Sequence, residues 1–216
     1  MEPATTLPNA LQGASERSNT YRLIARLWLY EVDQELLQRL LAPPLSQPFV
    51  EAGGLLPSDA DEQTVEDLSI DYCQIFIGPS GHLPPYQSVW ETGQLQGSTI
   101  ESMQQYINIA GYVVEAIPSR AMLDHLGIQL DVMGYVLEQV ASGQFDSEAL
   151  EELQDFAISF FERHLSWPKD LLDGASSRAT TDFYRSVIAM TQDFLESERD
   201  SFQDKAPMTP CGRRSP

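Results

Sequence analysis

The sequence predicts an all-α protein, and three observations lead to this fold class. Apolar residues recur at intervals of three and four along most of the chain, a spacing that is typical of amphipathic helices. Proline and glycine occur where these repeats stop, as expected at helix ends. The sequence has no convincing alternating strand, no Asn-Gly hairpin and no short-period repeat. We therefore expect one helical domain of about eight to ten helices.

The N-terminal half is expected to hold four helices. Residues 1–19 are polar and contain two prolines, so we expect a disordered lead-in. A first helix should follow from Thr20, and a second should run from an Asp33 cap to Pro43-Pro44. Residues 42–57 hold four prolines and two glycines and predict a linker. Ser58 and Ser98 are the expected caps of the third and fourth helices, and the third should end at Gly78. The expected inward-facing residues of the four helices are Tyr21, Ile24, Leu27, Trp28, Leu36, Leu37, Leu40, Leu41, Val65, Leu68, Tyr72, Ile75, Phe76, Ile100, Met103, Ile107 and Ala110.

The C-terminal half restarts after a break at Pro118-Ser119. A strongly apolar helix should follow, then one that begins at Asp146 or Ser147 and ends near His164-Leu165, and then a long helix from about Thr181. Their expected inward-facing residues include Met122, Leu126, Leu130, Met133, Leu137, Val140, Leu150, Leu153, Phe156, Phe160, Phe161, Phe183, Tyr184, Val187, Ile188, Phe194 and Leu195. We expect the helical domain to span residues 20–204 and a disordered tail to span 205–216.

The chain is strongly acidic. It has 13 Lys and Arg against 32 Asp and Glu, which gives a formal charge of −19, and 42% of its 216 residues are apolar. This excess repels nucleic-acid phosphates and anionic lipid, so we expect neither nucleic-acid binding nor membrane-surface binding. It favours a basic partner, although acidity also serves solubility alone.

The two cysteines and the N-terminus indicate a cytoplasmic protein. Cys73 lies in an apolar helical run, where it is expected to be a small core residue, and Cys211 lies in the proline-rich tail. Two cysteines so placed do not form a disulfide framework, which favours a reducing compartment. Residues 1–19 have no apolar signal-peptide core, and no run reaches the length needed to span a membrane.

The stretch from Ile75 to Glu91 is the first candidate site. It reads IFIGPSGHLPPYQSVWE, and its prolines predict a stiff loop. Tyr86 and Trp90 would offer flat apolar surface with a polar edge, as at binding hot spots. A stiff aromatic surface can hold a flexible peptide without first having to order itself. The same stretch also fits an ordinary buried loop between two helices.

Catalytic and metal-binding motifs lack support in the sequence. Ser80 does not lie in a Gly-x-Ser-x-Gly elbow after a strand. The three histidines are widely separated, without His-x-x-x-His, Glu-x-x-His or Cys-x-x-Cys spacing. Glycine-rich nucleotide-binding loops are also missing from the sequence. We expect no enzyme activity, no metal and no cofactor.

Asp124 and His125 form the second candidate site, at the start of the apolar helix that follows Pro118. Adjacent helix positions point about 100° apart, so the two side chains should not face each other. A buried His125 would need a hydrogen-bond partner, which the nearby loop backbone could supply. Asp124 suits the first turn of a helix and could also accept an arginine from a ligand. A helix-start carboxylate beside a satisfied core histidine explains the pair equally simply.

Four separated motifs together resemble one family. They are Asp71-Tyr72 to Phe76 with Gly78-Pro79, then Pro84-Pro85-Tyr86-x-Ser88-Val89-Trp90, then Asp124-His125-Leu126-Gly127, and lastly His164-Leu165 with Trp167 and Phe183-Tyr184. In order and spacing they are similar to the TorD/DmsD/NarJ family of molybdoenzyme-specific chaperones, over about residues 20–200. Two departures stand out: Arg120 to Leu123 replaces a common Glu-Pro-x segment, and Tyr86 replaces a common Trp.

The resemblance implies an all-α chaperone that binds the twin-arginine signal peptide, or an equivalent N-terminal segment, of a molybdopterin-containing oxidoreductase. Such a chaperone holds the apo-enzyme until its cofactor is inserted and delays export. The peptide-binding positions carried over from the family are Pro84, Pro85, Tyr86, Ser88, Trp90, Asp124 and His125. We expect Asp124 and neighbouring carboxylates to meet the arginine pair, and Tyr86 and Trp90 to bury the apolar part.

Two other functions fit the residues. An acidic helical adaptor could bind another helical or basic partner with the same apolar surfaces, and an enzyme could use Asp124 and His125 as base and acid on a small substrate. The break around residues 110–120 also allows a hinge between two helical halves, through which a homodimer could exchange helices.

Overall fold

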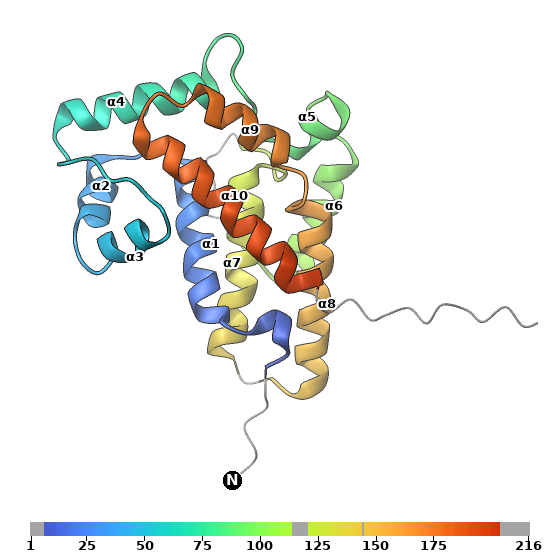
Figure 1. Cartoon of the computed structure of the whole chain (residues 1–216). Coiled ribbons are helices and arrows are strands. Elements are labelled where there is room, and N and C mark those ends of the chain that lie inside the picture. Colours follow the sequence, from blue (N-terminus) through green and yellow to red (C-terminus); the bar gives the residue numbers. More distant parts are fainter. Residues whose placement is uncertain (1–6, 114–120, 144, 204–216) are drawn as a thin grey trace, which may run out of the picture.

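The computed structural model describes residues 7–113, 121–143 and 145–203, and confirms the all-α class. Apart from one isolated β-bridge, its regular structure is helical. The described residues form ten α-helices, a short 3₁₀ turn (η1) before α1 and a π-helical turn (η2) after α4 (Figure 1). The elements are η1 (Asn9–Leu11), α1 (Ala14–Leu29), α2 (Gln34–Leu41), α3 (Ser46–Glu51), α4 (Glu62–Tyr72), η2 (Cys73–Ile77), α5 (Gln87–Thr92), α6 (Ser98–Ala110), α7 (Leu126–Ser142), α8 (Ser147–His164), α9 (Lys169–Arg178) and α10 (Asp182–Gln203).

Helices α1 and α7 form the centre of the molecule, with α10 crossing in front of them in Figure 1. Gly127 and Gly134, two turns apart on α7, let the two helices approach closely. A Cβ atom at Gly127 would lie 2.5 Å from Leu29 Cγ and 3.2 Å from the Ala25 carbonyl oxygen. The Ser18 hydroxyl donates a hydrogen bond to the Gly134 carbonyl across the same contact, at 2.7 Å. The α1–α7 pair is therefore built on backbone proximity as well as on apolar burial.

One continuous hydrophobic core joins this pair to the surrounding helices. The inward-facing residues predicted for the first helix, Tyr21, Ile24, Leu27 and Trp28, are all buried. The Trp28 indole donates a hydrogen bond to the Thr191 hydroxyl of α10 at 3.0 Å. Burial of such apolar surface is the main stabilising contribution to folding.

Two buried carboxylates fasten α10 at its two ends. Asp71 of α4 is fully buried and accepts hydrogen bonds from the backbone N–H groups of Thr180 and Thr181, at 2.9 and 2.8 Å, just before α10 begins. Near the other end, Glu198 pairs with Arg17 of α1 at 2.6 Å and accepts the Tyr21 hydroxyl at 2.9 Å. Both carboxylates are satisfied, as buried charges must be.

Several predicted boundaries are confirmed, but the N-cap of α6 is Gly97, without a side-chain capping bond, and not the expected Ser98. Asp33 and Asp146 cap α2 and α8 through their side chains, and α8 ends at His164. The expectation for α4 was wrong by three residues: Asp61, and not Ser58, accepts the capping N–H of Thr64, at 2.8 Å. The lead-in expected over residues 1–19 is already helical from Ala14, because Ala10, Leu11 and Ala14 bury apolar surface against the core.

Other expectations also need correction. The predicted linker 42–57 contains α3, which forms because Phe49 is buried against Phe183, with ring centroids 5.9 Å apart. Pro48 is tolerated there because it lies in the first turn, where its missing N–H has no helical partner. Cys73 is only partly buried and lies 3.7 Å from Glu31, so it is not a core residue. The expected hinge falls largely on residues 114–120 and the tail on residues 205–216, both outside the described residues.

Candidate functional site

The two candidate segments meet through their backbones. The N–H of Leu126 donates to the Pro85 carbonyl at 2.8 Å, and the N–H of Gln87 donates to the Asp124 carbonyl at 3.0 Å. These bonds place Tyr86 and His125 opposite each other in an isolated antiparallel bridge. Their rings meet edge to face, with centroids 5.2 Å apart. Residues 84–90 and 124–126, nearly forty positions apart, are thus held together by their backbones. We call this unit the corner.

Asp124 is fully buried in this corner. Its Oδ2 accepts the N–H of Ser88 at 2.9 Å, in the first turn of α5. Its Oδ1 and the Ser88 hydroxyl, also buried, have no hydrogen-bond partner among the described residues. A carboxylate that caps a helix from the inside holds backbone in place. In this conformation it does not reach an external arginine.

His125 is the N-cap of α7 and lies 6% exposed. Its Nδ1 accepts the N–H of Gly127 at 3.0 Å, so the neutral ring carries its proton on Nε2. Burial lowers the pKa of His125 to about 3. The expected hydrogen-bond partner from nearby backbone is present, and it belongs to the helix rather than to the loop.

Pro84, Tyr86 and Trp90 give the corner its half-buried surface. The Trp90 indole donates to the Pro84 carbonyl at 2.8 Å, which fixes the ring against the proline pair. Burial, and then the charge of Asp124, raise the pKa of the Tyr86 phenol, which stays neutral. Trp90 lies on α5, because the expected loop becomes helical from Gln87. Each of these three residues thus leaves part of an apolar or aromatic side chain in solvent.

A buried polar network packs against the corner. We did not predict it from the sequence. Its centre is Gln87, whose side chain uses both donors and accepts twice. Its Nε2 donates to Glu91 and to the Arg163 carbonyl at 2.7 and 2.8 Å. Its Oε1 accepts from Gln129 and His164 at 2.7 and 2.9 Å. The first residue of α5 is thereby fastened to both α7 and α8.

The network continues on both sides of Gln87. His164 donates through Nδ1 to Gln87, so its Nε2 is the acceptor for the Ser102 hydroxyl of α6 at 2.9 Å. Burial, followed by the Arg163 charge, lowers the pKa of His164 to about 3. Gln129 accepts the Trp167 indole at 2.8 Å. One sign of this network is present in the sequence: Gln129 is a polar residue inside an apolar helical stripe.

The seven carried-over residues therefore lie together, but they divide by access. Pro84, Tyr86 and Trp90 are partly exposed, whereas Pro85, Ser88, Asp124 and His125 are buried. We infer that the first group can touch a ligand and that the second positions it. No cluster of three or more His, Cys, Asp or Glu residues suited to a metal occurs in the described part of the chain.

Comparison with known proteins agrees with the family that the order of the motifs indicates. A model of the nitrate reductase delta subunit family matches residues 33–172. The chain belongs to this family. The resemblance to the TorD/DmsD/NarJ family is thereby confirmed. The match covers both segments of the corner and the network beneath it.

Two curated relatives of this chain are named as chaperones. The chain is 29% identical over 137 residues to the chaperone protein YcdY of Escherichia coli strain K12, covering 63% of this chain and 66% of the relative, just under two thirds of its length. It is 24% identical over 198 residues to the chaperone protein TorD of Shewanella loihica strain PV-4, covering 82% and 88%. No solved structure matches the chain significantly. Among the described helices, none is long and apolar enough to cross a membrane.

Proposed function

We propose that this protein is a cytoplasmic chaperone that binds the N-terminal leader of a molybdopterin-containing oxidoreductase, holds the apo-enzyme for cofactor insertion and delays its export. Family membership and two relatives named as chaperones support this role. The structural observation that carries it is the corner around the Tyr86–His125 bridge. Binding a leader requires no chemistry, and in the corner Asp124 Oδ2 and His125 Nδ1 accept backbone N–H groups, those of Ser88 and Gly127.

The corner suits a leader because it is already ordered. A twin-arginine leader combines two guanidinium groups with an apolar stretch. Tyr86 and Trp90 would cover the apolar stretch, since aromatic side chains supply large contact areas with few rotatable bonds. The proline pair and the backbone bridge remove most of the ordering cost that binding to a loose loop would carry. Asp124 and His125 act in this proposal as positioning residues.

Capture of the client tests this role. The tagged full-length chain, incubated with a native lysate, should retain an oxidoreductase of the molybdopterin class. A synthetic peptide of that client's N-terminal segment should then bind in calorimetry. Recovery of proteins without such a leader would contradict the proposal and favour a general adaptor. Size-exclusion chromatography of the purified chain shows whether a homodimer forms.

Substitution of Tyr86 tests the surface itself. Tyr86→Ala should weaken leader binding about tenfold or more, as at an aromatic hot spot, whereas Tyr86→Phe should retain most of the affinity. Exposed Ile109→Ala at the end of α6 is the matched control. Equal binding by Tyr86→Ala and wild type in the folded protein would remove the corner from the contact surface.

A further inference from the structure

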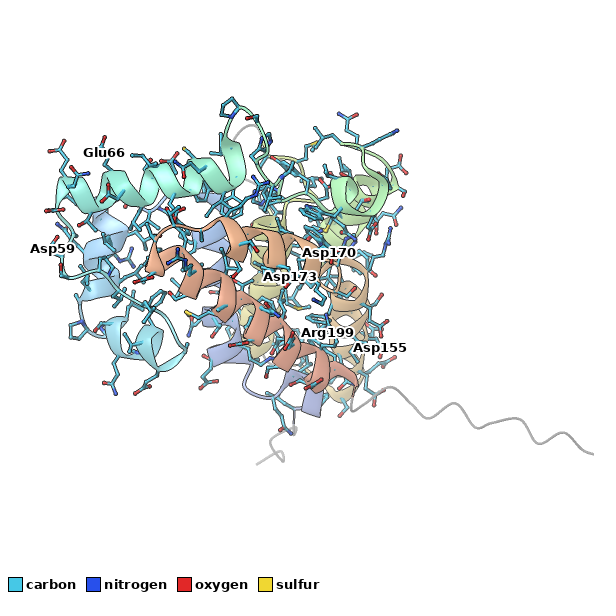
Figure 2. All side chains as sticks on the ribbon, turned by 45° about the horizontal axis from the view of Figure 1, so that its top comes forward. Asp59, Glu66, Asp155, Asp170, Asp173 and Arg199 are labelled. Atoms are coloured by element: carbon cyan, nitrogen blue, oxygen red, sulfur yellow. The ribbon has the colours of Figure 1, made fainter. Side chains whose placement is uncertain are left out.

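Charge is distributed very unevenly along this chain. Between Arg39 and Arg120 there is no Lys or Arg, and every charged residue over 40–119 is Asp or Glu. Two of these carboxylates hold distant parts of the fold: Asp71 accepts N–H groups just before α10, and Glu91 lies 3.9 Å from Arg163. On and before α4 the carboxylates lie in solvent without an ion pair among the described residues: Asp59, Asp61, Glu62, Glu66 and Asp67. Figure 2 shows Asp59 and Glu66 projecting away from the helical body.

A cleft opens beside these carboxylates, between α4, the segment 55–57 and the start of α10. Its volume is about 450 Å³. Its lining is part apolar and part polar. The apolar residues are Leu55, Leu56, Pro57, Leu68 and Phe183, and the polar ones are Thr64, Asp67, Thr181 and Asp182. Leu55 is 54% exposed, which leaves a large aliphatic side chain in water at the mouth of the cleft. We call this feature the α4–α10 cleft.

The groups around the cleft decide which ligand it fits. Asp67 accepts a hydrogen bond from Gln63 at 2.9 Å, which leaves its charge uncompensated. Asp182 pairs with Arg185 at 3.1 Å, but this carboxylate is 79% exposed and the pair is weakened by water. A lining that combines leucine side chains with two carboxylates attracts a cation that carries an aliphatic stem or an aliphatic neighbour. The same field repels phosphate and anionic lipid.

We propose that the α4–α10 cleft is a second docking site, which takes a basic amphipathic peptide segment of a protein partner. An Arg or Lys side chain of the segment meets Asp67 and Asp182, and a neighbouring leucine-like residue covers Leu55 and Leu56. This site is lined by elements other than those of the Tyr86 corner. The inference does not depend on leader binding at that corner.

Binding of a designed probe tests the cleft. The probe is a short fluorescent peptide with an Arg-Arg pair followed by leucines, and its partner peptide carries two glutamines instead of the arginines. Wild-type full-length protein should bind the arginine peptide more tightly than the glutamine peptide, and the difference should shrink at high salt. A photoreactive group on the probe should label residues within 55–68 or 181–183.

Two variants separate the charges from the apolar lining. Asp67→Asn with Asp182→Asn should weaken binding of the arginine peptide about 3- to 10-fold at low salt, as for exposed ion pairs. Leu55→Ala should weaken both peptides about 3- to 5-fold through lost apolar contact. The control Glu151→Gln with Asp155→Asn removes the same charge from exposed positions of α8, where Figure 2 shows Asp155 far from Asp59 and Glu66. This control should bind as wild type.

Three outcomes would overturn the proposal. One is wild-type binding by the cleft variants. Another is an equal loss in the α8 control, which would mean general attraction to an acidic protein. The last is complete loss in Tyr86→Ala together with labelling confined to the corner, which would place the probe there and leave the proposed leader binding intact. Persistence of binding in Tyr86→Ala and its loss in the cleft variants supports the second site.

Discussion

Tyr86 and His125 are paired backbone to backbone, and their rings meet edge to face at 5.2 Å. The pairing joins the proline loop to the start of α7 without any bond between the side chains of Asp124 and His125. It separates the residues that can touch a peptide from those that hold the surface, and this division leads to distinct expectations for each group.

Asp124 should behave as a positioning residue. Asp124→Asn retains an oxygen that can accept the Ser88 N–H, so the folded variant should bind leader peptide within about 3-fold of wild type. Asp124→Ala leaves that buried donor unpaired and should lower the free energy of unfolding by about 1–3 kcal/mol. Calorimetry and urea unfolding measure the two effects. A loss of about 2–5 kcal/mol of binding in Asp124→Asn would indicate direct pairing with an arginine instead.

Gln87 should be the most sensitive member of the network. Gln87→Ala would leave the Nδ1–H of His164, the side-chain N–H of Gln129 and the Arg163 carbonyl without the bonds that Gln87 makes to them. We therefore expect destabilisation of about 2–4 kcal/mol. Leader affinity should fall as well, because the first residue of α5 directs Tyr86. Ser102→Ala removes a single bond at the edge of the network and is expected to cost about 1 kcal/mol. If the two variants lost equal stability, Gln87 would not be the centre of the network.

The buried histidines predict a pH dependence of stability. Burial lowers the pKa of His125 and His164 to about 3, against about 6.5 in an unfolded chain. The unfolded chain therefore binds more protons between about pH 3 and 6.5, so stability is fully present above about pH 6.5 and is lost as the pH falls through this window. His125→Asn keeps an acceptor for the Gly127 N–H but does not titrate. Between pH 7 and pH 5 it should lose about 1–2 kcal/mol less stability than wild type, measured by urea unfolding; parallel losses would contradict the assigned burial effect.

Gly127 should tolerate alanine poorly. The new methyl group would meet Leu29 and the Ala25 carbonyl oxygen, and overpacking of this kind typically costs about 1–3 kcal/mol. A Cβ at Gly134 would lie 3.1 Å from Arg22 Cγ and 3.2 Å from Tyr21 Cβ, which is less close than the 2.5 Å contact at Gly127, so Gly134→Ala should cost less. Thermal unfolding of both variants ranks them. The reverse order would mean that α1 and α7 adjust more easily than their spacing suggests.

The long helices could be predicted because their apolar residues repeat at helical spacing over many turns, as in α7 and α8. Helix α9 could not, since Lys169–Arg178 is mostly polar and has a glycine in its middle. That glycine makes sense only in three dimensions: a Cβ at Gly174 would lie 3.1 Å from Leu83 of the proline loop. Local pattern carries little information about such contacts between distant segments.

The proximity of the seven candidate residues was predictable, and their geometry was not. The order of motifs indicated one common site, and the structure places the seven residues together. Nothing in the sequence indicates that Asp124 points inward, since carboxylates are mostly exposed. The Pro85–Leu126 and Gln87–Asp124 bonds involve main-chain atoms, which every sequence supplies. In the sequence, Gln87 is simply a polar residue next to Tyr86. Its role depends on four partners that only the fold brings to it.

The main-chain nature of the Tyr86–His125 pairing also bears on how binding preference can diverge. Neither partner relies on its side chain for the two bonds that flank the bridge, so exchanging the aromatic at position 86 leaves the frame in its register. A different aromatic ring at this position would change the shape of the exposed surface while the frame keeps its geometry. Binding preference can therefore change through a single aromatic side chain while the fold stays the same.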